Sequence, residues 1–156
     1  MRNTSAERDW LQASEFERRP AASYCVAMAQ IVVYGTRDSI QKNRRTLSDA
    51  IHRAVRAALA YPVEKRFHRF IALDPENFIY PEDRGDEYTI IEVSMFEGRS
   101  EAAKRRLIRE LFARIKAEVG IPPHSVEITI TETPKVNWGI RGLNAEDLSL
   151  GYDVDV

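Results

Sequence analysis

Cationic side chains stand at several points of this sequence where an expected strand or helix begins or ends. Lys65 and Arg66 precede a β-type run, and Arg99 precedes an expected helix. Trp138 and Arg141 follow the last expected strand. Cations that converge beside an aromatic wall can form a pocket for a small carboxylate, because guanidinium and ammonium groups bind carboxylate oxygens through charge-assisted hydrogen bonds. Ordinary solvated surface charge is the alternative interpretation of the same residues.

Other arrangements of reactive residues are weak in this sequence. His52, His68 and His124 lie far apart and have no partner of ligand type at helical spacing, so we expect no metal site. Ser48 and Asp49 are close to His52 on an expected helix, but a serine hydrolase presents its nucleophile on a strained turn, and the G-x-S-x-G string is absent. Neither the Walker pattern nor G-x-G-x-x-G occurs, so we expect no nucleotide cofactor.

The composition is that of an ordinary globular protein without a global attraction to polyanions. The 156 residues suffice for one domain, and the formal net charge is -1. Basic residues on the expected helices raise nucleic-acid binding as an alternative, but many acids offset them, so we expect no nucleic-acid partner. No apolar segment approaches the roughly 20 residues of a membrane span, so we expect no membrane partner. The lone Cys25 cannot form an internal disulfide, which favours a cytoplasmic protein.

The pattern of apolar residues predicts a strand, a helix and a second strand in the first half of the chain. A β-branched and aromatic run marks a strand at 30–34, and we expect Asp38 or Ser39 to cap the helix that follows. Apolar residues three and four positions apart place this helix at roughly 40–60. A second strand is expected at 67–73, before a turn-rich loop.

The same order of elements repeats in the second half. We expect a strand at 88–95, a helix capped by Ser100 and ended by Gly120, and a strand at 126–132. Apolar residues and helix-ending prolines of the two halves match without gaps at a constant offset of 60. The matching pairs are Ile31 and Ile91, Val33 and Val93, Leu47 and Leu107, Ile51 and Leu111, Val55 and Ile115, Leu59 and Val119, and Pro62 and Pro122. We interpret this match as an internal duplication.

Two tandem β-α-β units predict an α+β fold. Each unit pairs its strands in parallel through a right-handed crossover, which gives a four-stranded mixed sheet with two helices on one face. The first and third strands are apolar at consecutive positions, 31–33 and 90–91, which indicates that both faces of the sheet are buried. Two helices can cover one face, so we expect the same surface of another subunit to cover the second face in a closed homo-oligomer.

Residues 1–27 differ from the rest of the chain. Four arginines balance four acids there, with little apolar periodicity. We therefore expect an appended, disordered segment at 1–27 and a folded domain at 28–156.

Two strings in the second half resemble the tautomerase superfamily. They are Glu97-Gly98-Arg99-Ser100 and Asn137-Trp138-Gly139-Ile140-Arg141-Gly142. The resemblance extends from Met28 to Val156, and within the superfamily the chain is similar to the longer members of the malonate semialdehyde decarboxylase-like group. It implies a homotrimer of duplicated β-α-β units, no cofactor, and arginines that hold the carboxylate of a small substrate.

The resemblance also implies a catalytic amino-terminal proline, whose secondary amine acts as general base, general acid or nucleophile. Matched through Pro62 after the helix, that position falls on Ala29, so the chain lacks the family's proline there. The water-activating aspartate of the decarboxylase falls at Lys65. Of the decarboxylase's two arginines, one is matched at Arg99, and Glu97 stands at the other position. These departures put decarboxylase activity in doubt.

The nitrogen of Ala29 decides which chemistry this position can perform. As an ordinary amide it can neither accept a proton near neutral pH nor attack carbon. If translation starts at Met28 and that methionine is removed, Ala29 carries a primary α-amine with a reference pKa of about 7.7–8.0. The cations Lys65, Arg66 and Arg99 would lower that pKa toward the range of a useful general base.

Two functions of different classes stay open on the sequence. In the first, the protein transfers a proton between the keto and enol forms of a small 2-oxo or enol carboxylate. Arg99 and Arg66 then bind the acid group, Trp138 forms a wall of the site, and the amine of Ala29 moves the proton. In the second, the protein is a non-catalytic homotrimer that binds a small anion or a partner.

Overall fold

The computed structural model describes residues 29–148 of the chain. The expected appended segment 1–27, the candidate start Met28 and the final residues 149–156 lie outside the described residues. No helix within the described range is long and apolar enough to cross a membrane.

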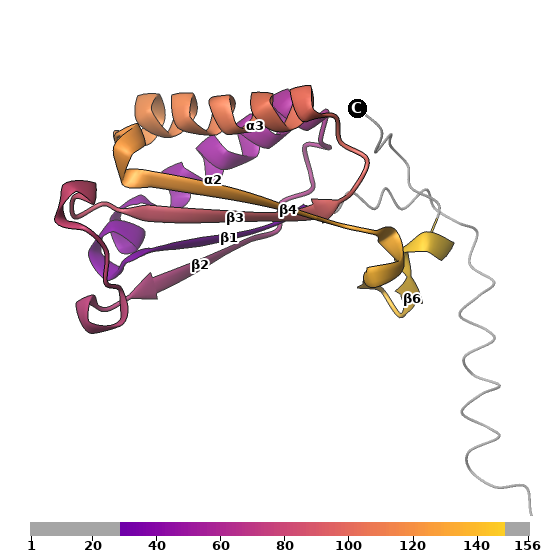
Figure 1. The fold of residues 1–156 in the computed structure, drawn as a ribbon, viewed down its shortest axis with the longest axis horizontal. Coiled ribbons are helices and arrows are strands. Elements are labelled where there is room, and N and C mark those ends of the chain that lie inside the picture. The colour runs from indigo at the N-terminus through magenta and orange to yellow at the C-terminus, as the bar shows by residue number, and fades with distance from the viewer. Residues whose placement is uncertain (1–28, 149–156) are drawn as a thin grey trace, which may run out of the picture.

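A four-stranded mixed sheet forms the centre of the molecule, in the order β2-β1-β3-β4 (Figure 1). Its strands are β1 (Ala29–Thr36), β2 (His68–Leu73), β3 (Thr89–Phe96) and β4 (Val126–Thr133). β1 pairs with β2 in parallel, β3 pairs with β4 in parallel, and the central pair of β1 and β3 is antiparallel. This arrangement confirms the predicted mixed sheet of two β-α-β units.

Two long helices lie side by side on one face of the sheet (Figure 1). They are α2 (Arg37–Leu59) and α3 (Glu101–Arg114), and α3 continues into a π-helical turn at Ile115–Val119. Ser100 caps α3 as expected, since its Oγ accepts from the Ala103 amide at 3.1 Å. The expected cap of α2 was wrong: the Thr36 side chain accepts from the Ser39 amide, so α2 begins one turn earlier than the apolar pattern indicated.

The strand registers of the two halves agree with the internal duplication. Ile31 lies opposite His68 in the first parallel pair, and Ile91 lies opposite Ile128 in the second. Both members of the second pair are shifted by 60 from those of the first, which is the offset found in the sequence. The helix ends match as well, since Ala60 and Gly120 both have left-handed backbones, with φ of 50° and 88°.

The central antiparallel pair places a local two-fold relation between the halves. Val32 lies directly opposite Glu92, the residue that matches it in the second half. Ala29 lies opposite Met95, and Gly35 lies opposite Thr89. At the offset of 60, Thr89 is the counterpart of Ala29 and Met95 is the counterpart of Gly35, so a two-fold rotation exchanges the two pairs. The two units therefore meet as a symmetric pair, with their strands running in opposite directions.

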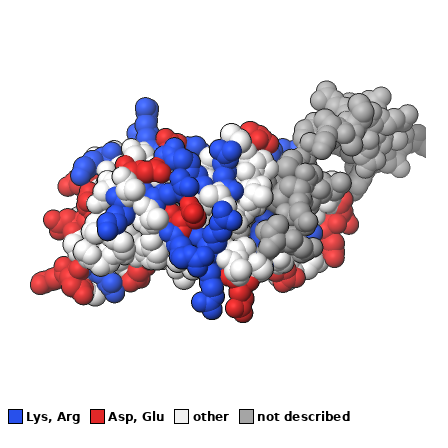
Figure 2. Space-filling model, turned by 90° about the horizontal axis from the view of Figure 1, so that it is seen from above, with Lys and Arg blue, Asp and Glu red and all other residues white. Residues whose placement is uncertain are grey.

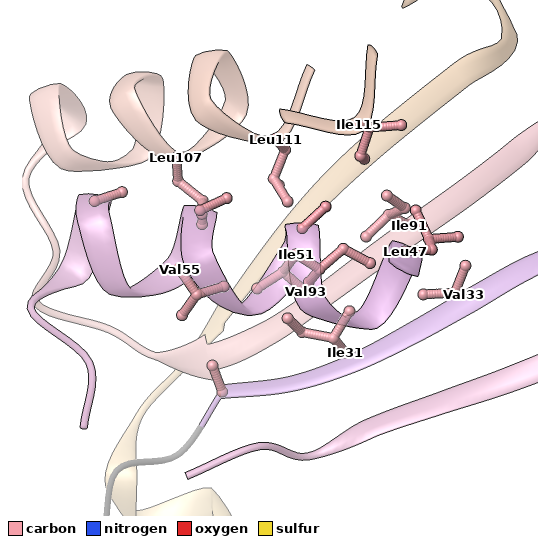
Figure 3. Packing of buried hydrophobic residues seen from close by; sticks show 14 of the residues in the cluster. Ile31, Val33, Leu47, Ile51, Val55, Ile91, Val93, Leu107, Leu111 and Ile115 are labelled. Atoms are coloured by element: carbon pink, nitrogen blue, oxygen red, sulfur yellow. The ribbon is translucent and has the colours of Figure 1, made fainter. Parts of the chain in front are cut away.

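The hydrophobic core lies between the helices and one face of the sheet (Figure 3). Figure 3 shows Leu47, Ile51 and Val55 of α2 packed close to Leu107 and Leu111 of α3, above the sheet. These side chains are at most 2% exposed. Their spacing of four residues on both helices is the reason that the apolar pattern predicted both elements correctly.

The opposite face of the sheet is only half-buried in the single chain. Val32 and Ile90 occupy its centre, and Ile71 at its edge is 38% exposed. The helices α2 and α3 leave this face uncovered (Figure 1). The consecutive apolar residues of β1 and β3 thus alternate between the two faces of the sheet. A single chain fully buries only the face that α2 and α3 cover.

A small hairpin, which the sequence patterns did not predict, follows β4. Its strands are β5 (Gly139–Ile140) and β6 (Leu143–Asn144), joined by a turn in which Arg141 has a φ of 54°. This segment packs Trp138 and Ala145 against Phe96, which is 1% exposed and forms a second apolar cluster. The hairpin lies beyond the end of β4, below the plane of the sheet in Figure 1.

Candidate functional site

The residues selected from the sequence gather at one end of the sheet. β1 and β2 begin at this end, because they are parallel, whereas β3 and β4 finish there, because β3 is antiparallel to β1. Each candidate residue stands at the start or the finish of one of these strands, or in the hairpin that follows β4. They are Ala29 at the start of β1, Lys65 and Arg66 before β2, Arg99 after β3, and Trp138 and Arg141 after β4.

The backbone nitrogen of Ala29 is held by Tyr61. It donates a hydrogen bond of 2.9 Å to the Tyr61 hydroxyl oxygen, and that hydroxyl lies 3.4 Å from the Ala29 carbonyl oxygen. Ala29 is 4% exposed and Tyr61 is 5% exposed, so the bond is buried. The sequence analysis missed Tyr61. At the offset of 60 it matches Ile121, so a hydroxyl group stands in the first half where the second half has an apolar side chain, and this difference was the available signal.

A second polar pair, which the sequence analysis also missed, lies in the same row of the sheet. Ala29 is opposite Met95, which is opposite Glu132 on its other side, so all three share the face that carries the helices. Lys104 of α3 donates to Glu132 Oε2 at 2.6 Å. The other oxygen, Oε1, is buried and has no hydrogen-bond partner among residues 29–148. A carboxylate with one partnered and one unpartnered oxygen therefore lies two strands from Ala29.

Arg99 is a buried cation at this end of the sheet. It is 5% exposed and stands between the end of β3 and Ser100, the cap of α3. Burial of a guanidinium costs free energy unless charged or hydrogen-bonding groups surround it. Arg99 is thus fixed by the fold rather than carried on a mobile surface chain, which suits a group that binds an anion.

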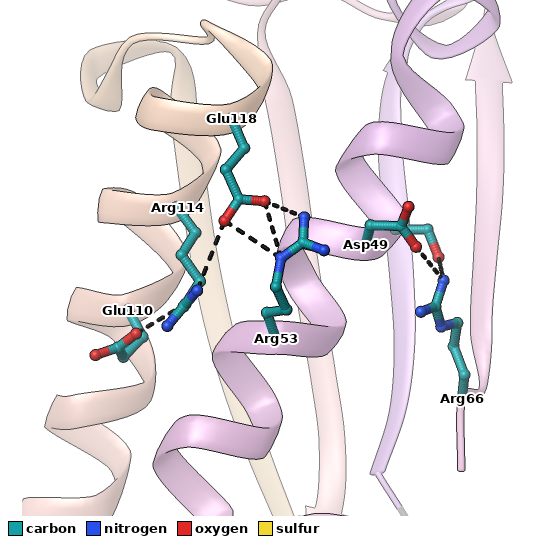
Figure 4. Close-up of polar contacts among 7 residues, drawn as sticks. Asp49, Arg53, Arg66, Glu110, Arg114 and Glu118 are labelled. Atoms are coloured by element: carbon teal, nitrogen blue, oxygen red, sulfur yellow. Dashed lines mark hydrogen bonds and ion pairs between the residues drawn. The ribbon is translucent and has the colours of Figure 1, made fainter. Parts of the chain in front are cut away.

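Lys65 and Arg66 lie in the connection between α2 and β2. The Lys65 amide donates to the Pro62 carbonyl at 3.2 Å, which forms a turn. The Arg66 guanidinium points toward α2, where it lies 2.6 Å from Asp49 Oδ1 and 3.4 Å from Ser48 Oγ (Figure 4). This bond from Arg66 holds the pKa of the Asp49 carboxyl below its ordinary value. The side chain of Arg66 is therefore engaged along the edge of α2.

Trp138 and Arg141 belong to the hairpin after β4. Trp138 lies edge-on to Phe96, with ring centroids 5.1 Å apart and an interplanar angle of 75°. This contact fixes the indole beside the last residue of β3. Arg141 is exposed in the hairpin turn.

The sequence neighbours Ser48, Asp49 and His52 do not form a hydrolase triad. Ser48 Oγ contacts His68 Nδ1 at 2.9 Å, whereas His52 Nε2 lies 2.8 Å from the Val63 carbonyl oxygen. Asp49 bonds to Arg66 instead of a histidine. Within residues 29–148, no group of three or more His, Cys, Asp or Glu side chains could hold a metal ion.

Comparison with known proteins assigns the family. Residues 65–141 match the family model described as tautomerase enzyme. The chain is 39% identical over 57 residues to 2-hydroxymuconate tautomerase of Pseudomonas putida, a match that spans 36% of this chain and 90% of that protein. The chain belongs to the tautomerase superfamily. The 2-hydroxymuconate tautomerase of Stutzerimonas stutzeri is 42% identical over a match of the same length.

Solved structures agree with this tautomerase assignment. FG41 malonate semialdehyde decarboxylase inhibited by 3-bromopropiolate is 29% identical, with a TM-score of 0.66, and the match covers 75% of this chain and 92% of that chain. A fused 4-OT solved as an asymmetric trimer has a TM-score of 0.66 at 22% identity, over 75% of this chain and 96% of that chain. The matches to the short tautomerases are about as long as one of the two units of this chain, whereas the matches to the longer solved proteins cover 75% of it.

Proposed function

We propose that this tautomerase superfamily member binds a small 2-oxo or enol carboxylate at the end of the sheet where β1 begins. The observation that carries the proposal is the position of Ala29, at the first residue of β1, in the same end of the fold as the buried Arg99. Arg99 binds the acid group, Lys65 adds positive charge, and Trp138 forms a wall. Arg66 joins them only when its bond to Asp49 opens.

The chemistry depends on the chemical state of the Ala29 nitrogen. In a chain that continues through Met28 this nitrogen is an amide, and its hydrogen is donated to Tyr61. In a chain that starts at Ala29 it is an amine, which accepts the proton released by the enol hydroxyl or by the carbon next to the carbonyl. The same amine then returns that proton to the other position, so the substrate is isomerised without a net change in protons.

Neighbouring cations favour the neutral amine. A free α-amine has a reference pKa of about 7.7–8.0, and positive charges at Arg99 and Lys65 lower the pKa because they oppose the ammonium form. Arg99 also stabilises the negative charge that develops on the enolate oxygen. The Tyr61 hydroxyl orients the nitrogen through the bond that it makes to position 29.

We also propose that the protein is a homotrimer. The half-buried sheet face around Val32 and Ile90 supports a symmetric assembly, because water contacts its apolar side chains in a single chain. Similarity to a fused 4-OT that forms a trimer points to the same stoichiometry. In such an assembly the open faces of three chains are buried against one another.

The test is the identity of the mature amino terminus, followed by an assay. Mass spectrometry of native protein measures whether the chain starts at Ala29, and ketonisation of phenylenolpyruvate measures proton transfer. Turnover by a chain that starts at Ala29, lost in Arg99→Ala, is the expected result. A terminus at Met1 together with no turnover would remove the enzyme function.

A non-catalytic homotrimer that binds a small anion or a partner is the second candidate. The buried bond from the Ala29 amide to Tyr61 favours it, since an amide donor fits this geometry without any free amine. In this case native protein and an Ala29→Pro variant are both inactive, and a carboxylate such as phenylenolpyruvate binds without conversion. Turnover by native protein rejects it.

A further inference from the structure

A hollow lies between the middle of α2 and the edge strand β2, and Arg66, which precedes β2, forms part of its lining. Its volume is about 380 Å³, which lies within the usual range of small-molecule sites. We call it the arginine pocket. The residues that line it are Arg44, Arg45, Ser48, Asp49, Arg66 and Phe70.

The arginine pocket carries an excess of positive charge. Three of its lining residues are arginines, and Asp49 is the one acid among them, which leaves a charge of two. Asp49 neutralises Arg66, to which it is bonded at 2.6 Å. Arg44 and Arg45 are exposed, and neither forms an ion pair with any residue in the range 29–148. Two adjacent guanidiniums without counter-ions favour the binding of an anion.

Two groups in the pocket are already held in place. Arg66 is fixed by Asp49 and lies 3.4 Å from Ser48 Oγ. Ser48 Oγ also contacts His68 Nδ1 at 2.9 Å. In the tautomer that carries its proton on Nδ1, His68 donates to Ser48 and leaves the Ser48 hydroxyl proton available for a ligand oxygen. An anion would therefore meet one guanidinium and one hydroxyl that need little reorganisation.

We propose that the arginine pocket binds a dianionic phosphate group, either inorganic phosphate or the phosphate of a small organic ester. Guanidinium forks match phosphate oxygens in pairs, and a charge of two on the pocket balances a dianion. Arg44, Arg45 and Arg66 supply the donors, and Ser48 supplies a hydroxyl. Phe70 contacts the organic part of an ester. This inference does not rest on the proposed tautomerase activity.

Titration calorimetry of the full chain with inorganic phosphate, at near-physiological salt, tests the site. Saturable binding is expected for native protein, and Arg44→Ala/Arg45→Ala should weaken it by about tenfold or more. The matched control is Arg106→Ala/Arg109→Ala, which removes two exposed arginines of α3 outside the pocket. This control should leave the affinity unchanged. Equal weakening by both double variants, or heat without saturation, overturns the proposal.

A substitution of Asp49, the one acid of the pocket, should change the phosphate affinity in the opposite direction. Asp49→Asn removes the one negative charge that offsets the arginines of the pocket, so phosphate affinity should rise several-fold. Asp38→Asn removes the same charge from the first turn of α2, outside the pocket, and should have no effect. An equal gain from both variants would indicate diffuse attraction and reject a defined site.

A third comparison separates the two sources of phosphate. Phenyl phosphate should bind more tightly than inorganic phosphate, and Phe70→Ala should remove that difference. Equal affinities in native protein would contradict the role given to Phe70 and restrict the ligand to free phosphate.

Discussion

The amide nitrogen of Ala29 and the hydroxyl oxygen of Tyr61 lie 2.9 Å apart in the buried end of the sheet. Tyr61 follows the last turn of α2, so this bond ties the beginning of β1 to the end of the helix packed above it. The bond thus fixes the one backbone nitrogen on which the proposed proton transfer depends.

Tyr61→Phe is expected to destabilise the protein by about 1–3 kcal/mol, because the buried Ala29 amide loses its acceptor. Urea denaturation measures the change in the free energy of unfolding. Tyr80→Phe is the matched control, since Tyr80 packs with tilted rings against Phe78 and Tyr88, and its hydroxyl bonds to no residue in the described range. Equal losses in the two variants would show that the Ala29 bond contributes nothing.

Val32→Asp is expected to convert the proposed trimer into monomers. Val32 lies at the centre of the uncovered sheet face between Arg69 and Glu92, where a further carboxylate would lose its hydration in an interface and stand beside the like charge of Glu92. Light scattering after size exclusion measures the molar mass. Thr46→Asp, on the exposed side of α2, should keep the native mass. Retention of the trimer by the Val32 variant, or a monomeric native protein, contradicts this prediction.

The free energy of unfolding should fall as the pH is lowered from about 6.5 to 4 because of His68. Burial is the main cause that lowers the pKa of His68 to about 4, and Arg66 and His52 act in the same direction while Asp49 opposes them. The unfolded chain takes up the proton near the ordinary pKa and the folded chain does not, so acid favours unfolding in this window. The loss at pH 5 is about 1–2 kcal/mol.

Denaturation at a series of pH values separates His68 from the other groups. In His68→Asn the dependence between pH 6.5 and 4 should flatten, whereas His124→Asn, which changes an exposed histidine, should follow native protein. An unaltered slope in the His68 variant would reject the assignment.

Lys104→Met should destabilise the fold by about 1–3 kcal/mol, because Glu132 then loses its counter-ion and already has one buried oxygen without a partner. Arg105→Met is the matched control on the same helix. Its pair with Glu101 is exposed, with atoms 3.9 Å apart, so little change is expected. Thermal denaturation distinguishes the two, and a larger loss in the Arg105 variant would contradict this reading of the pair.

The fold was predictable because its two units repeat one apolar pattern. The four-residue spacing of Leu47, Ile51 and Val55 is matched by Leu107 and Leu111, and these side chains form the core that the periodicity indicated. The start of α2 was missed because Thr36 caps it ahead of the first apolar turn. The hairpin after β4 was missed because strands of two residues leave no periodic signal.

The candidate site was predictable in its location and less so in its partners. The positions of Ala29 and Arg99 followed from strand order, which the sequence indicates. The bond from Ala29 to Tyr61 joins residues 32 positions apart, and the contact of Lys104 with Glu132 joins residues 28 positions apart. Such pairs depend on how a helix crosses the sheet. The ion pair of Arg66 with Asp49 also depends on where α2 lies beside β2, and the number of charges in the sequence does not reveal it.

The two-fold relation between the halves makes Thr89 the counterpart of Ala29 at the opposite end of the sheet. Tyr88 precedes Thr89 within the same polypeptide, so trimming of leading residues can expose an amine at one of these ends and never at the other. A sheet assembled from two separate chains would carry two such termini, whereas the sheet of this single chain can carry at most one.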